Sequence, residues 1–212
     1  PPTHGACMAP RRLLFPIAVS VLSFGCAQAP AGATDTPPVS TSAGYANVED
    51  ASRVLRKVSA DLNRDGLMDA VLVIAPRSNT ADPQDARFLP RIISLQLAQR
   101  GGGYREVARN HHVGACEVCG GAYGDGLTEV AAEPGSLTIT NEGGIAQRWS
   151  KTYVFRWEGA KDGMVLDRYL ALGDFSSDGT MGRVDLKAPT VAPADFASFD
   201  PKASGLPDPA GE

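Results

Sequence analysis

Hydrophobic and polar residues alternate with a period of two in eight short stretches of this chain, which is the pattern of β-strands with one face toward a core. Gly, Pro, Asn and Asp separate most of these stretches and favour turns. The predicted strands are 54–60, 70–75, 91–99, 104–110, 127–133, 136–142, 147–157 and 163–172. Short strands at this spacing predict a mainly β fold, an antiparallel meander that forms a sandwich or a partial barrel.

Only residues 47–55, NVEDASRVL, have helical character, with Asn47 as a cap and acidic residues in the first turn. We therefore expect at most one short N-terminal helix. The stretch 147–157 alternates most clearly and places four aromatic residues on one face, Trp149, Tyr153, Phe155 and Trp157. We interpret that face as sheet core, and a platform for sugar rings is the alternative.

The two ends of the chain differ in composition from the middle. Residues 26–44 are rich in Pro, Ala and Thr, and residues 187–212 are rich in Pro. Segments with so few large apolar groups bury too little surface to offset the entropy of ordering. We therefore predict a folded domain at 45–186, a tether before it and a flexible tail after it, which Phe196 and Phe199 dock locally.

Residues 1–25 comprise upstream residues and a signal peptide. Two basic residues, Arg11 and Arg12, precede an apolar run over 13–24, and small residues follow. A run of that length is typical of a secretory signal and is short for a membrane-spanning helix. The segment predicts export, to the periplasm or to a membrane surface.

The sequence LSFGC at 22–26 resembles a bacterial lipoprotein box, with Gly25 before Cys26. We expect Cys26 to carry a lipid that anchors the protein at the outer membrane or the periplasmic face of the envelope. The box departs from the usual pattern at Ser23, where Leu is common. Cleavage after the AGA at 31–33 is the alternative, and it would release the protein into the periplasm.

Overall composition is that of an ordinary globular protein. The 212 residues are 43% hydrophobic and 21% charged, with a formal net charge of −4. No basic patch interleaved with aromatic residues occurs along the chain, and the net charge is negative. We therefore expect no nucleic-acid partner.

Residues 61–69, DLNRDGLMD, carry the strongest chemical signal. Oxygen-bearing side chains stand at positions 1, 3, 5 and 9 of the segment, as Asp61, Asn63, Asp65 and Asp69. Gly66 at position 6 permits a sharp turn. Ca²⁺ takes six to eight oxygen ligands, so this spacing lets alternate side chains converge on one ion and relieves their mutual repulsion.

The backbone carbonyl of Leu67 adds a further candidate ligand, which makes the predicted calcium set Asp61, Asn63, Asp65, Leu67 and Asp69. The segment is not an EF-hand, because position 12 is Leu72 and the exit is strand-like. It resembles the calcium loop of FG-GAP-like (VCBS) repeats, DxNxDGxxD leading into a β-strand, and dockerin and thrombospondin type 3 loops are chemically similar. An Asx-rich turn without an ion is the alternative.

The segment GDFSSDGTMG at 173–182 imitates this loop weakly through Asp174, Ser176 and Asp178. Gly182 stands where the closing acid would be. We interpret it as a turn, and a second, weak ion site is the alternative.

Cys116 and Cys119 lie in the segment HHVGACEVCGGAYGDG at 111–126. Because an exported protein meets an oxidising compartment, we expect the two to form a disulfide. Two alternatives use the same thiols: a zinc or copper site with His111 or His112, and a thiol redox centre. A redox centre of the thioredoxin type would place the pair at the start of a helix, and GGAYGDG is a poor helix start.

The order of these parts, an acidic loop, a hairpin, CxxCGGxxGD and strands ending in RW, resembles a group of uncharacterised exported bacterial lipoprotein-type proteins over about residues 54–172. That resemblance implies an extracytoplasmic domain and transfers no activity. No nucleophile elbow, GxGxxG or P-loop occurs, and the chain has three His. We therefore expect a non-enzymatic module that binds a protein or a glycan, with a thiol redox protein or a secreted carbohydrate-binding module as alternatives.

Overall fold

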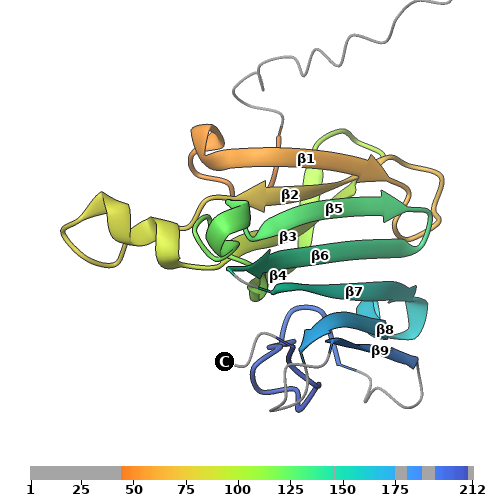
Figure 1. The fold of residues 1–212 in the computed structure, drawn as a ribbon. Coiled ribbons are helices and arrows are strands. Elements are labelled where there is room, and N and C mark those ends of the chain that lie inside the picture. Colours follow the sequence, from red (N-terminus) through yellow and green to blue (C-terminus); the bar gives the residue numbers. More distant parts are fainter. Residues whose placement is uncertain (1–43, 146, 175–180, 188–193, 210–212) are drawn as a thin grey trace, which may run out of the picture. The chain divides into compact units, whose positions relative to one another are not determined.

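The computed structural model describes residues 44–145, 147–174, 181–187 and 194–209 (Figure 1). The expected signal segment, Cys26 and nearly all of the tether lie outside the described residues. So does the middle of the turn at 173–182. Among the described residues, no helix has the length and apolar character needed to cross a membrane.

Nine strands form two antiparallel sheets in the described part of the chain. The first sheet has the order β1-β2-β3-β4, and the second has the order β5-β6-β7-β8-β9. The strands of the first sheet are β1 Val54–Ala60, β2 Asp69–Ile74, β3 Arg91–Ala98 and β4 Tyr104–Gly114. Those of the second are β5 Leu127–Glu133, β6 Ser136–Gly144, β7 Arg148–Glu158, β8 Gly163–Asp174 and β9 Met181–Lys187. Within each sheet, every strand pairs with the next along the chain, so both sheets are meanders.

The predicted antiparallel β-meander is therefore confirmed. Of the two predicted architectures, a sandwich and a partial barrel, the structure has the sandwich of two sheets. The eight predicted strands correspond to β1–β8. The ninth strand, β9, was not predicted; it lies at the end of the predicted domain and pairs with residues 168–174 of β8. Its residues alternate between exposed and half-buried, so its apolar periodicity is weak.

Helical structure is limited to short 3-10 turns in the described residues: η1 Ala51–Arg53, η2 Pro83–Phe88, η3 Gly121–Tyr123 and η4 Gly159–Lys161. The candidate helix at 47–55 contracts to η1, capped by Asp50 rather than Asn47. The helix cannot extend further because Val54, the next residue, already has extended backbone and begins β1.

One apolar core fills the space between the sheets and draws alternate residues from both. Val71 and Val73 face it from β2, Leu137 and Ile139 from β6, and the aromatic pair Tyr153 and Phe155 from β7. The core interpretation of the aromatic face on β7 is thus confirmed for Tyr153 and Phe155, which are 2% and 0% exposed, and Trp157 packs against the same core.

A bulge sets which residues of β8 reach this core. The register slips between Val154 and Phe155, which pair with Arg168 and Leu166, so Asp167 is an extra residue on β8. A one-residue shift turns every later side chain to the other face. Leu166 before the bulge and Tyr169 after it therefore both point inward.

The first sheet is also covered on its outer face. Ala70, Leu72, Ile74 and Ile92 form a second cluster there with partly buried side chains from residues 45–54 and from Tyr104. The amide of Gln96 fixes this cover, because it accepts a hydrogen bond from the Ala46 N–H and donates one to the Ala46 carbonyl. Two covered faces explain why β2 is a continuous apolar run.

The C-terminal segment is docked through Phe196 and Phe199, as expected, and it packs more closely than a flexible tail. Residues 194–199 do not form a loose tail: Ala194 and Phe196 hydrogen-bond to Leu166 and Met164 of β8. Phe196 and Phe199 are 1% and 2% exposed within the main core. These two aromatic rings bury enough apolar surface to hold the segment in place, although its overall composition is Pro-rich and poor in large apolar residues.

Candidate metal loop and disulfide segment

The acidic loop at 61–69 joins β1 to β2, as predicted, and the core anchors it. Leu62 is fully buried in the main core. Gly66 has φ +87°, a left-handed conformation that an L side chain rarely adopts, which explains Gly at the sharp turn. The sequence thus forms a tight curl whose side-chain oxygens lie close to its own backbone.

Those oxygens accept backbone N–H groups of the same loop. The two carboxylate oxygens of Asp61 accept from Asp65 and Gly66, both at 3.0 Å. A carboxylate oxygen of Asp65 accepts from Leu67 at 2.8 Å, and the Asn63 amide donates to the other at 2.9 Å. The Asn63 and Leu67 hydrogen bonds lower the pKa of Asp65. The loop is therefore a series of Asx turns.

Asp69 differs from the other acids because it is fully buried. One of its oxygens accepts the Leu62 N–H and the other accepts the Ala98 N–H, each at 2.8 Å. Burial raises the pKa of Asp69, and the backbone donors, Ala98 first, oppose that rise. Its carboxylate thereby ties the acidic loop to the end of β3.

The loop also contacts the second sheet. The Asp61 carbonyl accepts the N–H of Gly135, in the β5–β6 turn, at 3.1 Å. The guanidinium of Arg64 donates to the Pro134 carbonyl at 3.3 Å. Gly135 has a φ of +78°, a conformation that L side chains rarely adopt, which explains Gly at this position. The acidic loop thus sits at a joint between the two sheets.

The donor set suits calcium in its chemistry, since carboxylate, amide and carbonyl oxygens are the ligands that Ca²⁺ takes. The positions of these oxygens in the structure, however, do not form a metal site. Among the described residues, no group of three or more His, Cys, Asp or Glu side chains is gathered so that it could hold a metal ion. Asp61 and Asp65 instead turn their oxygens to N–H donors of the loop.

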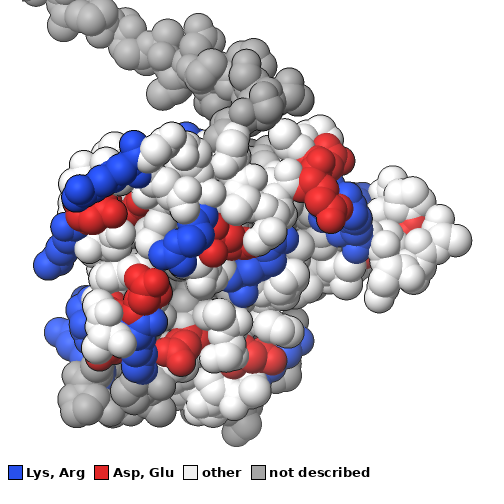
Figure 2. All heavy atoms as spheres, turned by 180° about the vertical axis from the view of Figure 1, so that it is seen from behind, with Lys and Arg blue, Asp and Glu red and all other residues white. Residues whose placement is uncertain are grey.

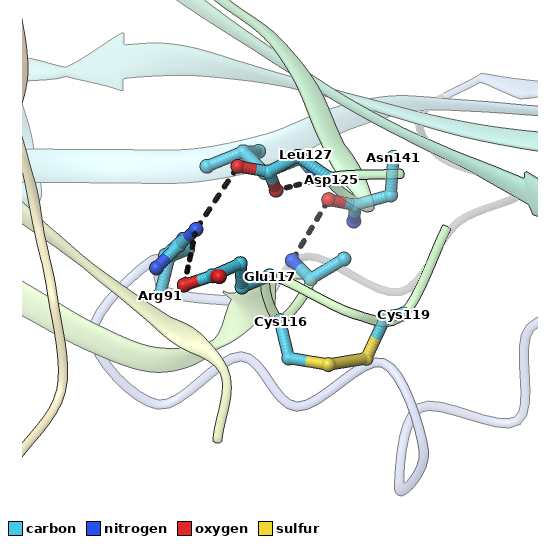
Figure 3. The surroundings of a disulfide bond; sticks show 8 residues. Arg91, Cys116, Glu117, Cys119, Asp125, Leu127 and Asn141 are labelled. Carbon is cyan, nitrogen blue, oxygen red and sulfur yellow. Dashed lines mark hydrogen bonds and ion pairs between the residues drawn. A yellow bond between two sulfur atoms is a disulfide. The ribbon is translucent and has the colours of Figure 1, made fainter. Parts of the chain in front are cut away.

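Cys116 and Cys119 form the predicted disulfide, with their Cα atoms 5.0 Å apart (Figure 3). The pair closes a turn between β4 and η3 rather than opening a helix. Cys116 is buried and Cys119 is exposed. His111 and His112 lie exposed on β4, and no group of three metal-ligating side chains that includes them occurs among the described residues, which therefore offer no support for the zinc or copper alternative.

Side chains that the sequence analysis did not single out hold this segment in place. The guanidinium of Arg91, 7% exposed, lies 2.9 Å from the Asp125 carboxylate and 3.8 Å from that of Glu117 (Figure 3). Asn141 on β6 accepts from the Ala115 N–H at 2.9 Å. It also donates to the Val113 carbonyl at 2.8 Å. The disulfide segment is therefore linked to both sheets.

Close packing accounts for several glycines of GGAYGDG. A side-chain carbon at Gly120 would meet the Gly124 carbonyl oxygen at 2.3 Å, and one at Gly126 would meet Cys119 Cβ at 2.9 Å. Both approaches are shorter than van der Waals contact. The motif is thus explained by a compact fold around the disulfide. In the sequence, the signal for Arg91 and Asp125 was no more than a charged residue beside a strand end.

Figure 2 shows charged side chains of both signs on one face of the molecule. Lys and Arg alternate there with Asp and Glu, and no large patch of one sign appears.

Comparison with known proteins adds little. No family model matches the chain, and no curated protein matches it. A solved structure described as a Xanthomonas type IV secretion system related protein is similar over 69% of this chain and 61% of its own, less than two thirds of its length. The identity is 13% and the TM-score is 0.36, values too low to inform the function of this chain.

Proposed function

We propose that this chain is an extracytoplasmic β-sandwich that binds Ca²⁺ in the loop at 61–69 and serves as a binding module of the cell envelope for a protein or glycan ligand. A lipid on Cys26 would anchor it to the membrane. The observation that carries the proposal is the oxygen series Asp61, Asn63, Asp65 and Asp69 on a loop that connects β1 to β2 and hydrogen-bonds to the β5–β6 turn of the second sheet.

An ion in this loop would have a structural effect beyond the loop itself. The acidic loop connects β1 to β2, bonds to Gly135 between β5 and β6, and reaches the end of β3 through Asp69. Fixing the loop would therefore fix one end of both sheets. A ligand surface at that end would gain from such preorganisation, because fewer groups need ordering on binding.

Calcium is favoured over magnesium for a physical reason. Mg²⁺ demands a near-ideal octahedron at about 2.0–2.1 Å and gives up water reluctantly, whereas Ca²⁺ tolerates irregular sets of six to eight oxygens. A curled loop that offers carboxylate, amide and carbonyl oxygens suits the larger ion. Asp61 and Asp65 would turn from their N–H donors toward the ion as it binds.

Thermal unfolding of the full chain in chelator, calcium and magnesium tests the metal site. An ion that binds the folded state alone stabilises it by about 2.7 kcal/mol at a hundredfold excess over Kd. We expect that gain with calcium, a smaller one with magnesium, and none in Asp65→Ala. Asp174→Ala is the control in the weaker 173–182 turn and should keep most of the gain. Equal midpoints in chelator, calcium and magnesium would mean that the segment is an Asx-rich turn.

Export and lipid attachment are tested separately, by the intact mass of the protein from its native host. We expect a mature chain that begins at Cys26 and carries added lipid mass, and a Cys26→Ser variant that lacks it. An unmodified N-terminus near Thr34 would contradict the anchor and leave the calcium proposal unaffected.

A thiol redox function is the second candidate, and one observation favours it: Cys119 is exposed while its partner Cys116 is buried. An exposed sulfur is open to attack by an external thiolate. A reduction potential in the range of thiol oxidoreductases, together with a reactive thiol after reduction, would support it. A Cys116–Cys119 disulfide with a reduction potential below that range would instead be a structural bond.

A further inference from the structure

A polar cavity of about 200 Å³ opens where η1 and the residues before it meet the end of β2 and the middle of β4. Three arginines from different parts of the first sheet line it: Arg53 from η1, Arg77 after β2 and Arg109 on β4. Since a water molecule occupies about 30 Å³ of liquid, the space could hold a small ligand group together with some water. The cavity lies apart from both the acidic loop and the disulfide.

The three guanidinium groups differ in how their charge is balanced. Arg109 donates to Glu106 at 2.6 Å and to the Asn47 carbonyl at 2.8 Å, so it is fully engaged. Arg77 lies 3.1 Å from Glu49, with both side chains more than half exposed. A pair so exposed is worth little and can exchange its partner.

Arg53 is the unbalanced member. It is half-buried and donates to the Ala75 carbonyl, and no carboxylate of the described residues forms an ion pair with it. Burial lowers the pKa of Arg53 and the charge of Arg77 is the next cause, while the charges of Asp50 and Glu49 oppose that lowering. Two cations that repel each other across a polar cavity would both gain from an anion between them.

The acids at the rim balance Arg53 only in part: the charges of Asp50 and Glu49 act on it, but neither carboxylate forms an ion pair with it. Asp50 accepts hydrogen bonds from the Ser52 N–H and hydroxyl as the cap of η1, which lowers the pKa of Asp50 and keeps it ionised there. Glu49 is committed to Arg77, through an exposed contact. An incoming anion could therefore replace Glu49 on Arg77 and reach Arg53 in the same step.

We propose that the cavity between Arg53 and Arg77 is a binding site for the oxyanion group, carboxylate or phosphate, of a small ligand. Guanidinium groups match such anions with paired N–H donors, and that geometry gives selectivity over chloride. Arg109 orients the site through Asn47, which forms part of its wall. The proposal is independent of calcium and of the lipid anchor.

Thermal unfolding of the full chain in calcium-free buffer tests this site, with sodium phosphate, sodium acetate and sodium chloride compared at equal ionic strength. We expect a saturable rise in the midpoint with phosphate, acetate or both, and none with chloride. A rise with phosphate would indicate a phosphate ligand, and a rise with acetate would indicate a carboxylate ligand. Phosphate also stabilises proteins without binding, so the variants decide.

Arg77→Gln, at an exposed position, should raise the apparent Kd for the active anion tenfold or more while the protein stays folded. Arg53→Lys keeps the charge, loses the planar pair of donors, and should weaken binding similarly. The matched control is Arg105→Gln, an exposed arginine on the same strand as Arg109 that pairs with Asp162. A midpoint rise that is equal in wild type, Arg77→Gln and Arg105→Gln, or equal with chloride, would overturn the proposal.

Discussion

The two ends of the sandwich hold their loops by different means. At one end, which we call the acidic-loop end, residues 61–69 meet the 134–135 turn and the end of β3. At the other, the disulfide end, residues 115–126 meet β6 and the start of β3. The acidic-loop end relies on carboxylates that accept backbone N–H groups, and the disulfide end on a covalent bond and a buried guanidinium.

The comparison shows that two loops of one sandwich can be held by interactions that depend on different solution conditions. Carboxylate acceptors depend on pH and on cations, whereas a disulfide depends on redox conditions. The acidic-loop end would then be sensitive to its ionic surroundings, and the disulfide end would be insensitive to them in an oxidising compartment. Four perturbations sharpen or break this comparison.

The largest effect is expected from Asp69→Ala at the acidic-loop end. The change leaves the buried N–H groups of Leu62 and Ala98 without acceptors, which costs about 1–3 kcal/mol each, so we expect a loss of about 3 kcal/mol in the free energy of unfolding. Urea unfolding measures it. Asp69→Asn keeps one acceptor and should lose less. A loss below about 1 kcal/mol would mean that the rest of the loop satisfies these groups.

Removing the disulfide should cost less than removing Asp69. With Cys116 and Cys119 both changed to Ala, the loss from so small a closed loop is about 2 kcal/mol at most. Hydrogen exchange should rise in residues 115–126 and stay unchanged in residues 61–69. Equal acceleration at both ends would break the comparison, because it would show that the ends are not independent.

Asp125→Asn should destabilise the disulfide end by about 1 kcal/mol, because the pair with Arg91 is buried on one side only. Asp125 is half exposed, and Glu117 remains near Arg91. Glu117→Gln, at 3.8 Å from Arg91, is the matched control and should change the free energy of unfolding by only a few tenths of a kcal/mol. The opposite order of the two variants would contradict the role given to Asp125.

The smallest effect is a pH dependence at Asp65, an exposed carboxylate whose pKa is lowered by its hydrogen bonds. Its contribution to stability is present above its ordinary pKa and is lost as pH falls through the lower folded value. The difference in thermal midpoint between wild type and Asp65→Asn should shrink from about pH 6 to about pH 3. A difference in midpoint that grows toward acidic pH would contradict the lowered pKa of Asp65 in the folded state.

Local patterns in the sequence were enough to predict the strands and the disulfide. Alternation marks a strand wherever one face is buried, so β1–β8 could be found without any tertiary information. The pairing of Cys116 with Cys119 followed from export and proximity along the chain. The curl of the acidic loop followed likewise from its Asx residues and Gly66, and the calcium in it stays a prediction.

Long-range contacts decided the rest. The composition of the C-terminal segment predicts a flexible tail docked by Phe196 and Phe199, and only the structure shows that both rings enter the main core, where the segment pairs with the part of β8 that β9 leaves free. Arg53, Arg77 and Arg109 are far apart in sequence and share a cavity only once β1, β2 and β4 are aligned. Burial depends on what packs against a residue. The sequence alone therefore fixed the local elements, and the tertiary structure decided which charged and aromatic side chains meet.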